Sequence, residues 1–416
     1  MQRIFRRFNR PYLFLILATL GPGLIAGFVD NDAPGIATYS LAGARFGYSL
    51  LWVLVIASLE LALFQELGAR LGIVTGKGLA ALIRENFGLR WVALAMVVLF
   101  VSNTGTTAAE LAGLAAALHI FHIPVVITVI VAATAICFVL TRFDFRKFEI
   151  LFLIVSFIYF VYVISGFKAH PDWTLAVKNT FIPTIQFSKA FIFTAIAVVG
   201  TTITPWGQFL IQSFQVDKKL GLEHLKYERL DVFLGSFFLG FIAFFVVVAT
   251  AATAWAHGVR VDTVADAAVA LRPFAGSLAS HLFAIGLLNS ALFGLAILPL
   301  STAYTISEGF GWESGINKSF REAREFYILI AISIIIGALI VVFPNFNLLS
   351  ILFISQALNG LLLPIILVFL VILATNEEIM GEYRNQGWLS WITIATVASL
   401  SVLSIVTAFS FLPIFK

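Results

Sequence analysis

The first long apolar segment of the chain contains the stretch Gly21-Pro22-Gly23-Leu24-Ile25-Ala26-Gly27-Phe28-Val29-Asp30-Asn31-Asp32-Ala33-Pro34-Gly35. It places two carboxylates, Asp30 and Asp32, at membrane depth, where a charged group is costly and marks a functional site by default. Pro34 and Gly35 interrupt helical hydrogen bonding and free backbone carbonyls beside those acids. Acidic oxygens and free carbonyls together predict a cation site at a break in the first membrane helix.

The composition around this stretch is that of an integral membrane protein. The chain has 416 residues, of which 60% are hydrophobic and 12% charged, and its mean hydropathy is +1.01. A soluble domain carries about 25% charged residues, so this chain has too little polar surface to coat a globule in water. Its partner is therefore the lipid bilayer. Nucleic acid is not expected as a partner, because the basic residues lie in short loops between apolar segments.

The apolar segments predict an all-α protein that forms a single transmembrane domain over residues 1–416. A helix needs roughly 20 apolar residues to cross the hydrocarbon, and we expect about eleven such spans from the sequence. The first and the sixth are interrupted. The spans lie near 13–42, 48–67, 91–118, 123–141, 149–166, 190–213, 232–256, 280–304, 327–343, 347–374 and 389–412.

The distribution of Lys and Arg predicts the orientation of these spans. With the amino end in the cytoplasm, 19 of the 26 Lys and Arg residues fall on the cytoplasmic side. We therefore expect a multi-pass protein of the plasma (inner) membrane, with a cytoplasmic amino terminus and an extracytoplasmic carboxyl terminus. The basic stretch Met1–Arg10 is interpreted as a cytoplasmic anchor rather than a cleaved signal peptide.

The sixth apolar segment repeats the interruption of the first. It breaks at Gly200-Thr201-Thr202-Ile203-Thr204-Pro205-Trp206-Gly207. The two breaks are five spans apart in chain order, with four spans between them, so the broken helices run in opposite directions through the membrane. Matching interruptions in two halves of a chain indicate the midplane site of a transporter. We place repeat one at about 11–167, repeat two at about 187–375 and an extra helix at about 388–413.

The two breaks supply the first candidate metal ligands. Asp32 lies at the break itself, although capping of the second half-helix is the alternative role. Asp30 is a ligand or outer-shell group, or else lines a hydrated vestibule. Thr201 and Thr204 offer hydroxyl or carbonyl oxygens from the sixth segment, whereas threonines also bond to the backbone of their own helix. We expect Trp206 to form a bulky wall of the site.

Four further polar residues lie deep in other spans. Glu110 is expected to be an accessory acid that lines the ion path, because a buried acid must pair, be protonated or face water. Gln356 and Asn359 share a helix face and are either interhelical hydrogen-bonding groups or carbonyl donors to a cation. Glu60 is either an interior structural acid or an outer group that attracts metal.

The donor atoms at the breaks predict a hard cation. Neither break contains Met or Cys, and the lone Cys137 lies in an apolar run. Carboxylate, hydroxyl and carbonyl oxygens suit Mg²⁺ or Mn²⁺, which we expect as the transported ion; no resident cofactor is expected. An enzyme is not expected either, since the sequence has no His-Glu-x-x-His motif of the kind that intramembrane metalloproteases need.

At these positions the chain resembles the Nramp family of divalent-metal transporters. The motifs that carry the likeness are Gly21-Pro22-Gly23, the break at Asp32, Ala42-Gly43-Ala44, Leu51-Trp52 and Arg70-Leu71-Gly72-Ile73-Val74-Thr75-Gly76-Lys77. The resemblance extends through spans one to ten. It implies the LeuT-like architecture of two inverted five-helix repeats, with helices 1 and 6 broken.

Five positions depart from the family pattern. Gly35 stands where the family has a ligating Asn, Thr204 replaces its sulfur ligand Met, and Trp206 replaces a His linked to proton movement. Thr201 supplies the ligating carbonyl that an Ala provides in the family, and Thr107 replaces an Asp associated with proton transfer. These replacements resemble the Nramp-related magnesium transporter branch, which implies a wider site that accepts Mg²⁺ and Mn²⁺.

We therefore expect uptake of Mg²⁺, with Mn²⁺ as a further cargo, by alternating access and without proton coupling. The alternatives are a proton-coupled Mn²⁺/Fe²⁺ carrier of the same family and a sodium-driven organic-solute symporter of the same fold. The two acids Asp30 and Asp32 disfavour the symporter. The sequence is compatible with a monomer.

Overall fold

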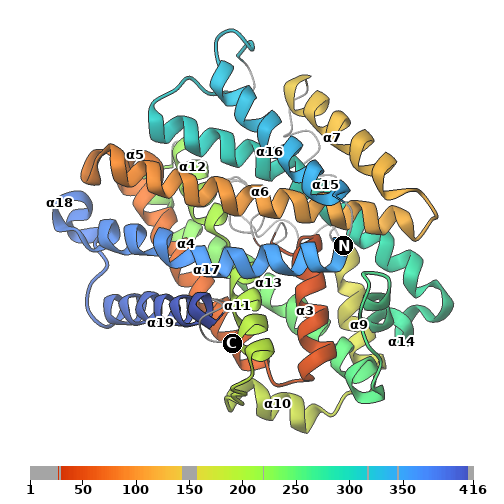
Figure 1. The fold of residues 1–416 in the computed structure, drawn as a ribbon. Helices are drawn as coiled ribbons and strands as arrows, with labels where there is room; N and C mark the ends of the chain where they lie inside the picture. Colours follow the sequence, from red (N-terminus) through yellow and green to blue (C-terminus); the bar gives the residue numbers. More distant parts are fainter. Residues whose placement is uncertain are drawn as a thin grey trace, which may run out of the picture.

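A computed structural model describes Gly27 and residues 30–142, 157–218, 220–315, 318–343 and 346–410. Within these residues every regular element is a helix (Figure 1). The α-helices are α3 Ala33–Phe46, α4 Leu51–Thr75, α5 Leu79–Phe87, α6 Leu89–His119, α7 Val125–Arg142, α9 Phe160–Lys168, α10 Trp173–Phe181, α11 Lys189–Thr202, α12 Pro205–Asp217, α13 Leu225–Thr253, α14 Arg272–Ala275, α15 Ala279–Phe310, α16 Arg324–Val342, α17 Leu348–Thr375, α18 Glu377–Met380 and α19 Trp388–Ser410.

The helices match the predicted spans and make this a multi-pass membrane protein. Eight helical stretches of the described chain are long and apolar enough to cross a membrane. Each predicted span from the second to the eleventh coincides with a helix over its described residues. Of the first span, residues 13–26 and 28–29 lie outside the described residues, and so do residues 149–156 of the fifth. The all-α fold class is therefore confirmed.

Two short helices, α5 and α10, lie outside the predicted spans. The helix α5 lies between Gly78 and Gly88, and it buries Leu79 and Leu82 while leaving Glu85 exposed. The helix α10 begins after Asp172, whose side chain accepts a hydrogen bond from the Leu175 amide, 2.9 Å away. Both helices have nine residues. A search for runs of roughly 20 apolar residues passes over helices of that length.

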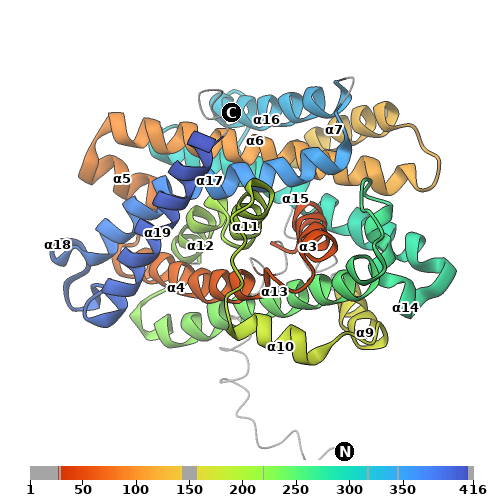
Figure 2. The same ribbon diagram turned by 60° about the horizontal axis from the view of Figure 1, so that its bottom comes forward.

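The three short helices at the breaks lie in the middle of the bundle. Figure 2 shows α3, α11 and α12 between an upper layer that includes α6, α7 and α16 and a lower layer that includes α4, α10 and α13. The helix α17 runs beside α6, and α19 lies at the edge of the bundle against α17. Backbone interrupted at this depth is tolerated only where protein or a water-filled cavity surrounds it. The layers provide that surrounding.

Glycine allows the sixth span to approach its neighbour at backbone level just before the break. A Cβ at Gly200 of α11 would overlap the carbonyl oxygen of Gln356 and the backbone of Gly360 in α17. In the other direction, a Cβ at Gly360 would overlap the carbonyl oxygen of Ile196 in α11. Small residues at a helix crossing in membranes permit this close packing. The end of α11, and with it Thr201 and Thr202, is therefore held against α17.

Candidate functional site

The break in the first span is organised by Asp32. The helix α3 begins at Ala33, and Asp32 is its N-cap, with an extended backbone and its Oδ1 atom 2.6 Å from the Gly35 amide. Pro34 lies in the first turn, where its missing N–H costs nothing. The capping role and the ligand role are compatible, because a carboxylate has two oxygens and about four acceptor positions.

Three oxygens converge beside Gly35. A Cβ built on this glycine would lie 2.8 Å from Asp32 Oδ1, 3.0 Å from the backbone oxygen of Asp30 and 3.1 Å from Thr201 Oγ1. The Thr201 hydroxyl is buried and has no hydrogen-bond partner among the residues that the structure describes. The three oxygens come from both breaks and belong to a carboxylate, a carbonyl and a hydroxyl. These are the oxygen types that hard dications bind. The point beside Gly35 is the candidate cation site.

A hydrogen bond joins the two breaks directly. The Thr204 hydroxyl, between α11 and α12, donates to Asp30 Oδ1 over 3.1 Å, whereas Asp30 Oδ2 is buried and has no partner in the described ranges. Thr202 instead donates to the Val198 carbonyl within its own helix, and its hydroxyl lies 3.0 Å from that of Tyr39 in α3. Thr201 and Thr204 therefore face the acids. Thr202 instead bonds to the backbone of its own helix, which was the alternative for these threonines.

Glu110 brings a third acid to the same place. It lies on α6, fully buried, with its carboxyl group facing Asp32 and the backbone amide of Ala33, although neither oxygen reaches good hydrogen-bond geometry. Gly294 of α15 makes room for that carboxyl group, since a Cβ there would overlap it. None of the ion pairs between described residues includes Asp30, Asp32 or Glu110. Three buried acids without a basic partner form a site that favours a bound cation.

The candidate metal ligands are a mixture of side-chain and backbone oxygens rather than a cluster of acidic, His or Cys side chains. Among the residues that the structure describes, no group of three or more His, Cys, Asp or Glu side chains has the geometry to hold a metal ion. Hydroxyl and backbone oxygens therefore have to contribute, as they do beside Gly35. An ion that keeps some of its water ligands fits such a site better than one that needs a complete protein cage.

The two amides of α17 bond to each other and to α6. Asn359 Oδ1 accepts from the Ser102 hydroxyl over 2.6 Å, and Asn359 Nδ2 donates to Thr106 Oγ1 and to Gln356 Oε1, each over 3.0 Å. Gln356 Nε2 donates to Ser355 Oγ over 3.2 Å. These contacts favour the interhelical alternative for Gln356 and Asn359, and a ligand role for either stays a prediction.

Two other predicted positions are also located. Glu60 accepts a hydrogen bond from Thr396 of α19 over 3.2 Å, which favours its alternative as an interior structural acid. Trp206 is fully buried two residues after Thr204, and its indole Nε1 has no partner. Its role as a wall of the site stays a prediction.

Sequence reasoning missed two sets of residues near the site. Tyr39 contacts Thr202 from one turn beyond Gly35. The buried glutamines of α12, Gln208 and Gln212, follow Thr204 at intervals of four residues. That spacing was visible in the sequence, because residues four apart share a helix face.

Comparison with known proteins gives a consistent result. Residues 23–410 match the sequence model of the Nramp (natural resistance-associated macrophage protein-like) family. The divalent metal cation transporter MntH of Verminephrobacter eiseniae is 31% identical over 384 residues, which cover 89% of this chain and 84% of that protein. A manganese transporter of Eremococcus coleocola has a similar structure, with a TM-score of 0.79 and 23% identity over 96% of this chain and 87% of that one.

A more distant structure shares the same architecture. Mhp1, a nucleobase-cation-symport-1 family transporter, matches with a TM-score of 0.54 and 14% identity over 94% of this chain and 90% of that one. At these identities the likeness concerns the fold. It confirms the expected LeuT-like architecture.

Filling the space beside Gly35 is expected to weaken metal binding. In Gly35→Ala the new methyl group would take the point on which the three oxygens converge, and we expect the Kd for Mn²⁺ to rise at least about tenfold, the scale of losing roughly one good ligand. Calorimetric titration of the purified protein measures this. Gly286→Ala in α15 is the control, because its Cβ would meet only Ile158, 3.8 Å away. Equal affinities in the two variants would contradict the assignment of the site.

Proposed function

This chain belongs to the Nramp family, and on that premise we propose that it transports a divalent metal cation across the membrane by alternating access. The single observation that carries the proposal is the convergence of three oxygens beside Gly35, between two broken helices. Transporters of this architecture bind their cargo between discontinuous helices near the midplane. Rocking of one set of helices against the other would expose that point to each side in turn.

The transported ion that we propose first is Mn²⁺. The similar proteins described above are a divalent metal cation transporter and a manganese transporter, which supports Mn²⁺ more directly than the Mg²⁺ that the sequence favoured. Mg²⁺ is proposed as a second cargo on the donor set alone. The ligand atoms at the two breaks are the Thr204 hydroxyl and the three oxygens beside Gly35, and none of these is sulfur. Oxygen ligands suit both ions.

Transport without proton coupling is supported by two side chains. The Thr107 hydroxyl donates to the Asn103 carbonyl over 2.8 Å, so it is engaged within its own helix. Trp206 is an indole, which donates a hydrogen bond but does not titrate. The proton-coupled Mn²⁺/Fe²⁺ carrier remains the alternative, and the carboxyl group of Glu110 beside Asp32 is the observation that favours it.

We propose uptake as the physiological direction, with the amino terminus in the cytoplasm. The excess of Lys and Arg on one side supports this orientation. A dication entering a negatively charged interior gains about 2.3 kcal/mol per elementary charge for each 100 mV of membrane potential. That gradient alone would drive accumulation of the ion.

Removing the charge of Asp32 is expected to abolish transport. Asp32→Asn keeps the side-chain shape and the cap at Gly35 but lacks the negative charge that binds the ion. We expect Mn²⁺ uptake into proteoliposomes to fall at least about 100-fold, because binding and transport share this group. Glu60→Gln removes another intramembrane acid, one that bonds to α19, and is expected to leave uptake unchanged. Uptake by Asp32→Asn at the wild-type rate would remove the central residue of the proposal.

Placing a thioether sulfur at the break, as in the family pattern, is expected to change the ion preference. In the wild-type protein we expect Mg²⁺ to compete with Mn²⁺ for uptake. In Thr204→Met a thioether replaces the hydroxyl, and we expect the Mg²⁺ concentration for half-inhibition to rise about tenfold, because sulfur does not suit Mg²⁺. Competition assays with labelled Mn²⁺ measure both values. A wild-type protein insensitive to Mg²⁺ would refute Mg²⁺ as second cargo.

A pH-sensitive dye inside the vesicles tests coupling. During Mn²⁺ uptake we expect the internal pH to stay constant, because Thr107 and Trp206 do not exchange protons at neutral pH. A proton ionophore added at the end of the assay checks that the dye responds. Internal acidification that depends on Mn²⁺ and is lost in Glu110→Gln would instead establish the proton-coupled alternative.

A further inference from the structure

A row of buried glutamines leads away from the cation site along α12. Thr204, which bonds to Asp30, is followed by Gln208, Gln212 and Gln215, and each of these side chains is at most 1% exposed. Residues three and four apart lie on one face of a helix. The row therefore runs from the break toward the carboxyl end of α12, where Lys218 follows.

The helix α4 places a further glutamine beside the start of this row. A Cβ at Gly68 would lie 3.6 Å from the Gln208 carbonyl oxygen, and one at Gly72 would lie 2.9 Å from the Gln212 carbonyl oxygen. The two helices therefore run in the same direction, with residue 68 level with residue 208 and residue 72 level with residue 212. One turn before Gly68, the fully buried Gln65 is level with the segment between Thr204 and Gln208.

Gln65 and Gln208 have no hydrogen-bond partners within the described part of the chain. Both polar atoms of Gln65 and both of Gln208 are buried and unpaired, and Gln212 Oε1 is unpaired as well. Asn359 of α17 differs from them, because it bonds through both of its polar atoms. Gln215, at the end of the row, is intermediate: its Nε2 donates to Glu228 over 2.8 Å, and its Oε1 is unpaired. A buried amide without partners destabilises a protein. Helix packing therefore does not account for Gln65 and Gln208, because Gly68 and Gly72 already bring α4 and α12 together.

We propose that Gln65, Gln208 and Gln212 line the route by which the metal ion leaves the Asp30–Asp32 site toward the carboxyl end of α12. The inference rests on the proposed transport function and adds a path to it. Amide oxygens bind a cation and amide N–H₂ groups orient its remaining water ligands. They are uncharged, so they favour entry of the ion without retaining it, as conduction requires.

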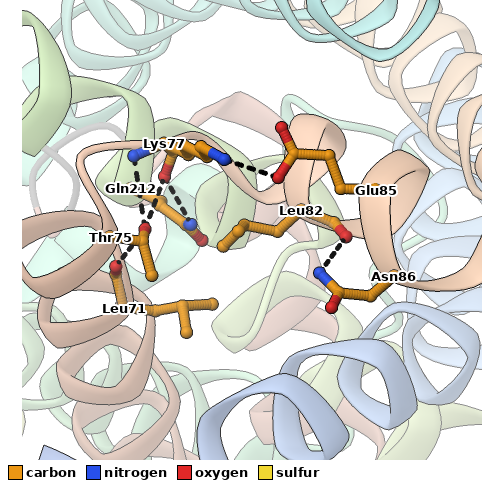
Figure 3. A network of polar contacts seen from close by, with 7 residues as sticks. All are labelled: Leu71, Thr75, Lys77, Leu82, Glu85, Asn86 and Gln212. Atoms are coloured by element: carbon orange, nitrogen blue, oxygen red, sulfur yellow. Dashed lines mark hydrogen bonds and ion pairs between the residues drawn. The ribbon is translucent and has the colours of Figure 1, made fainter. Parts of the chain in front are cut away.

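The far end of this route is closed in the structure. Gln212 Nε2 donates to the backbone oxygen of Lys77 over 2.8 Å, in the turn between α4 and α5 (Figure 3). The same turn is fixed by the Thr75 hydroxyl, which accepts from the Lys77 amide over 3.2 Å, and by the ion pair of Lys77 with Glu85. Release of the ion along the route requires the bond between Gln212 and Lys77 to open.

Replacing the unpaired amides by leucine separates a transport role from a packing role. We expect Gln208→Leu and Gln65→Leu to lower the initial rate of Mn²⁺ uptake into proteoliposomes at least about tenfold while the Kd for Mn²⁺ stays within about threefold, since the binding site is intact. We also expect the melting temperature to stay equal or rise, because an unsatisfied polar group has been removed. Gln208→Asn, which restores an amide, is expected to recover part of the rate.

The matched control removes an unpaired polar group away from the route. Thr128 of α7 is 4% exposed and its hydroxyl has no partner, so Thr128→Val should leave the uptake rate unchanged. A Gln208→Leu protein that transports at the wild-type rate would overturn the exit route alone. A lower melting temperature in that variant would assign the amide to packing and also overturn it. A wild-type protein that moves no divalent ion would overturn the proposed function and the route together.

Discussion

Backbone groups inside a membrane must find their hydrogen-bond partners within the protein, and this constraint governs the centre of the molecule. Two helices are interrupted there, and each interruption leaves polar groups that lipid cannot satisfy. Asp32 satisfies the start of α3 through the Gly35 amide, and Thr204 at the other break satisfies one oxygen of Asp30. The remaining oxygens point toward one place beside Gly35. A cation is the chemical group that such a set of acceptors lacks.

The charges at the centre of the bundle also indicate a cation site. Asp30, Asp32 and Glu110 are buried together, and within the described part of the chain none of them pairs with Lys, Arg or His. Basic residues are confined to the ends of the spans, as in the pair of Arg70 with Glu66. The middle of the bundle is therefore acidic and uncompensated until an ion binds.

The sequence predicted the breaks and the acids because intramembrane charge and helix-breaking residues are local signals. Asp32, Thr201 and Thr204 could be located in this way, and the structure brings them together. Partners across helices could not be read from the chain: Glu60 bonds to α19, and Asn359 bonds to α6, through contacts more than 250 residues apart in sequence. The α12 glutamines were missed because they carry no charge and lie beyond the helix-breaking residues. The choice between Mg²⁺ and Mn²⁺ depended on resemblance, because oxygen ligands suit both ions.

Glycines near the break in the sixth span pack the two halves of that span against different helices. Gly200 and Gly360 join α11 to α17 backbone against backbone, whereas Gly68 and Gly72 join α12 to α4. The closest backbone packing of the two halves is therefore against different helices, and the two residues between α11 and α12, Ile203 and Thr204, connect them. If the unit of α11 with α17 moved relative to the unit of α12 with α4, the torsional change would fall on that dipeptide. The hinge and the ligand-bearing segment are then the same piece of chain, so movement of the units alters the cation's coordination sphere directly.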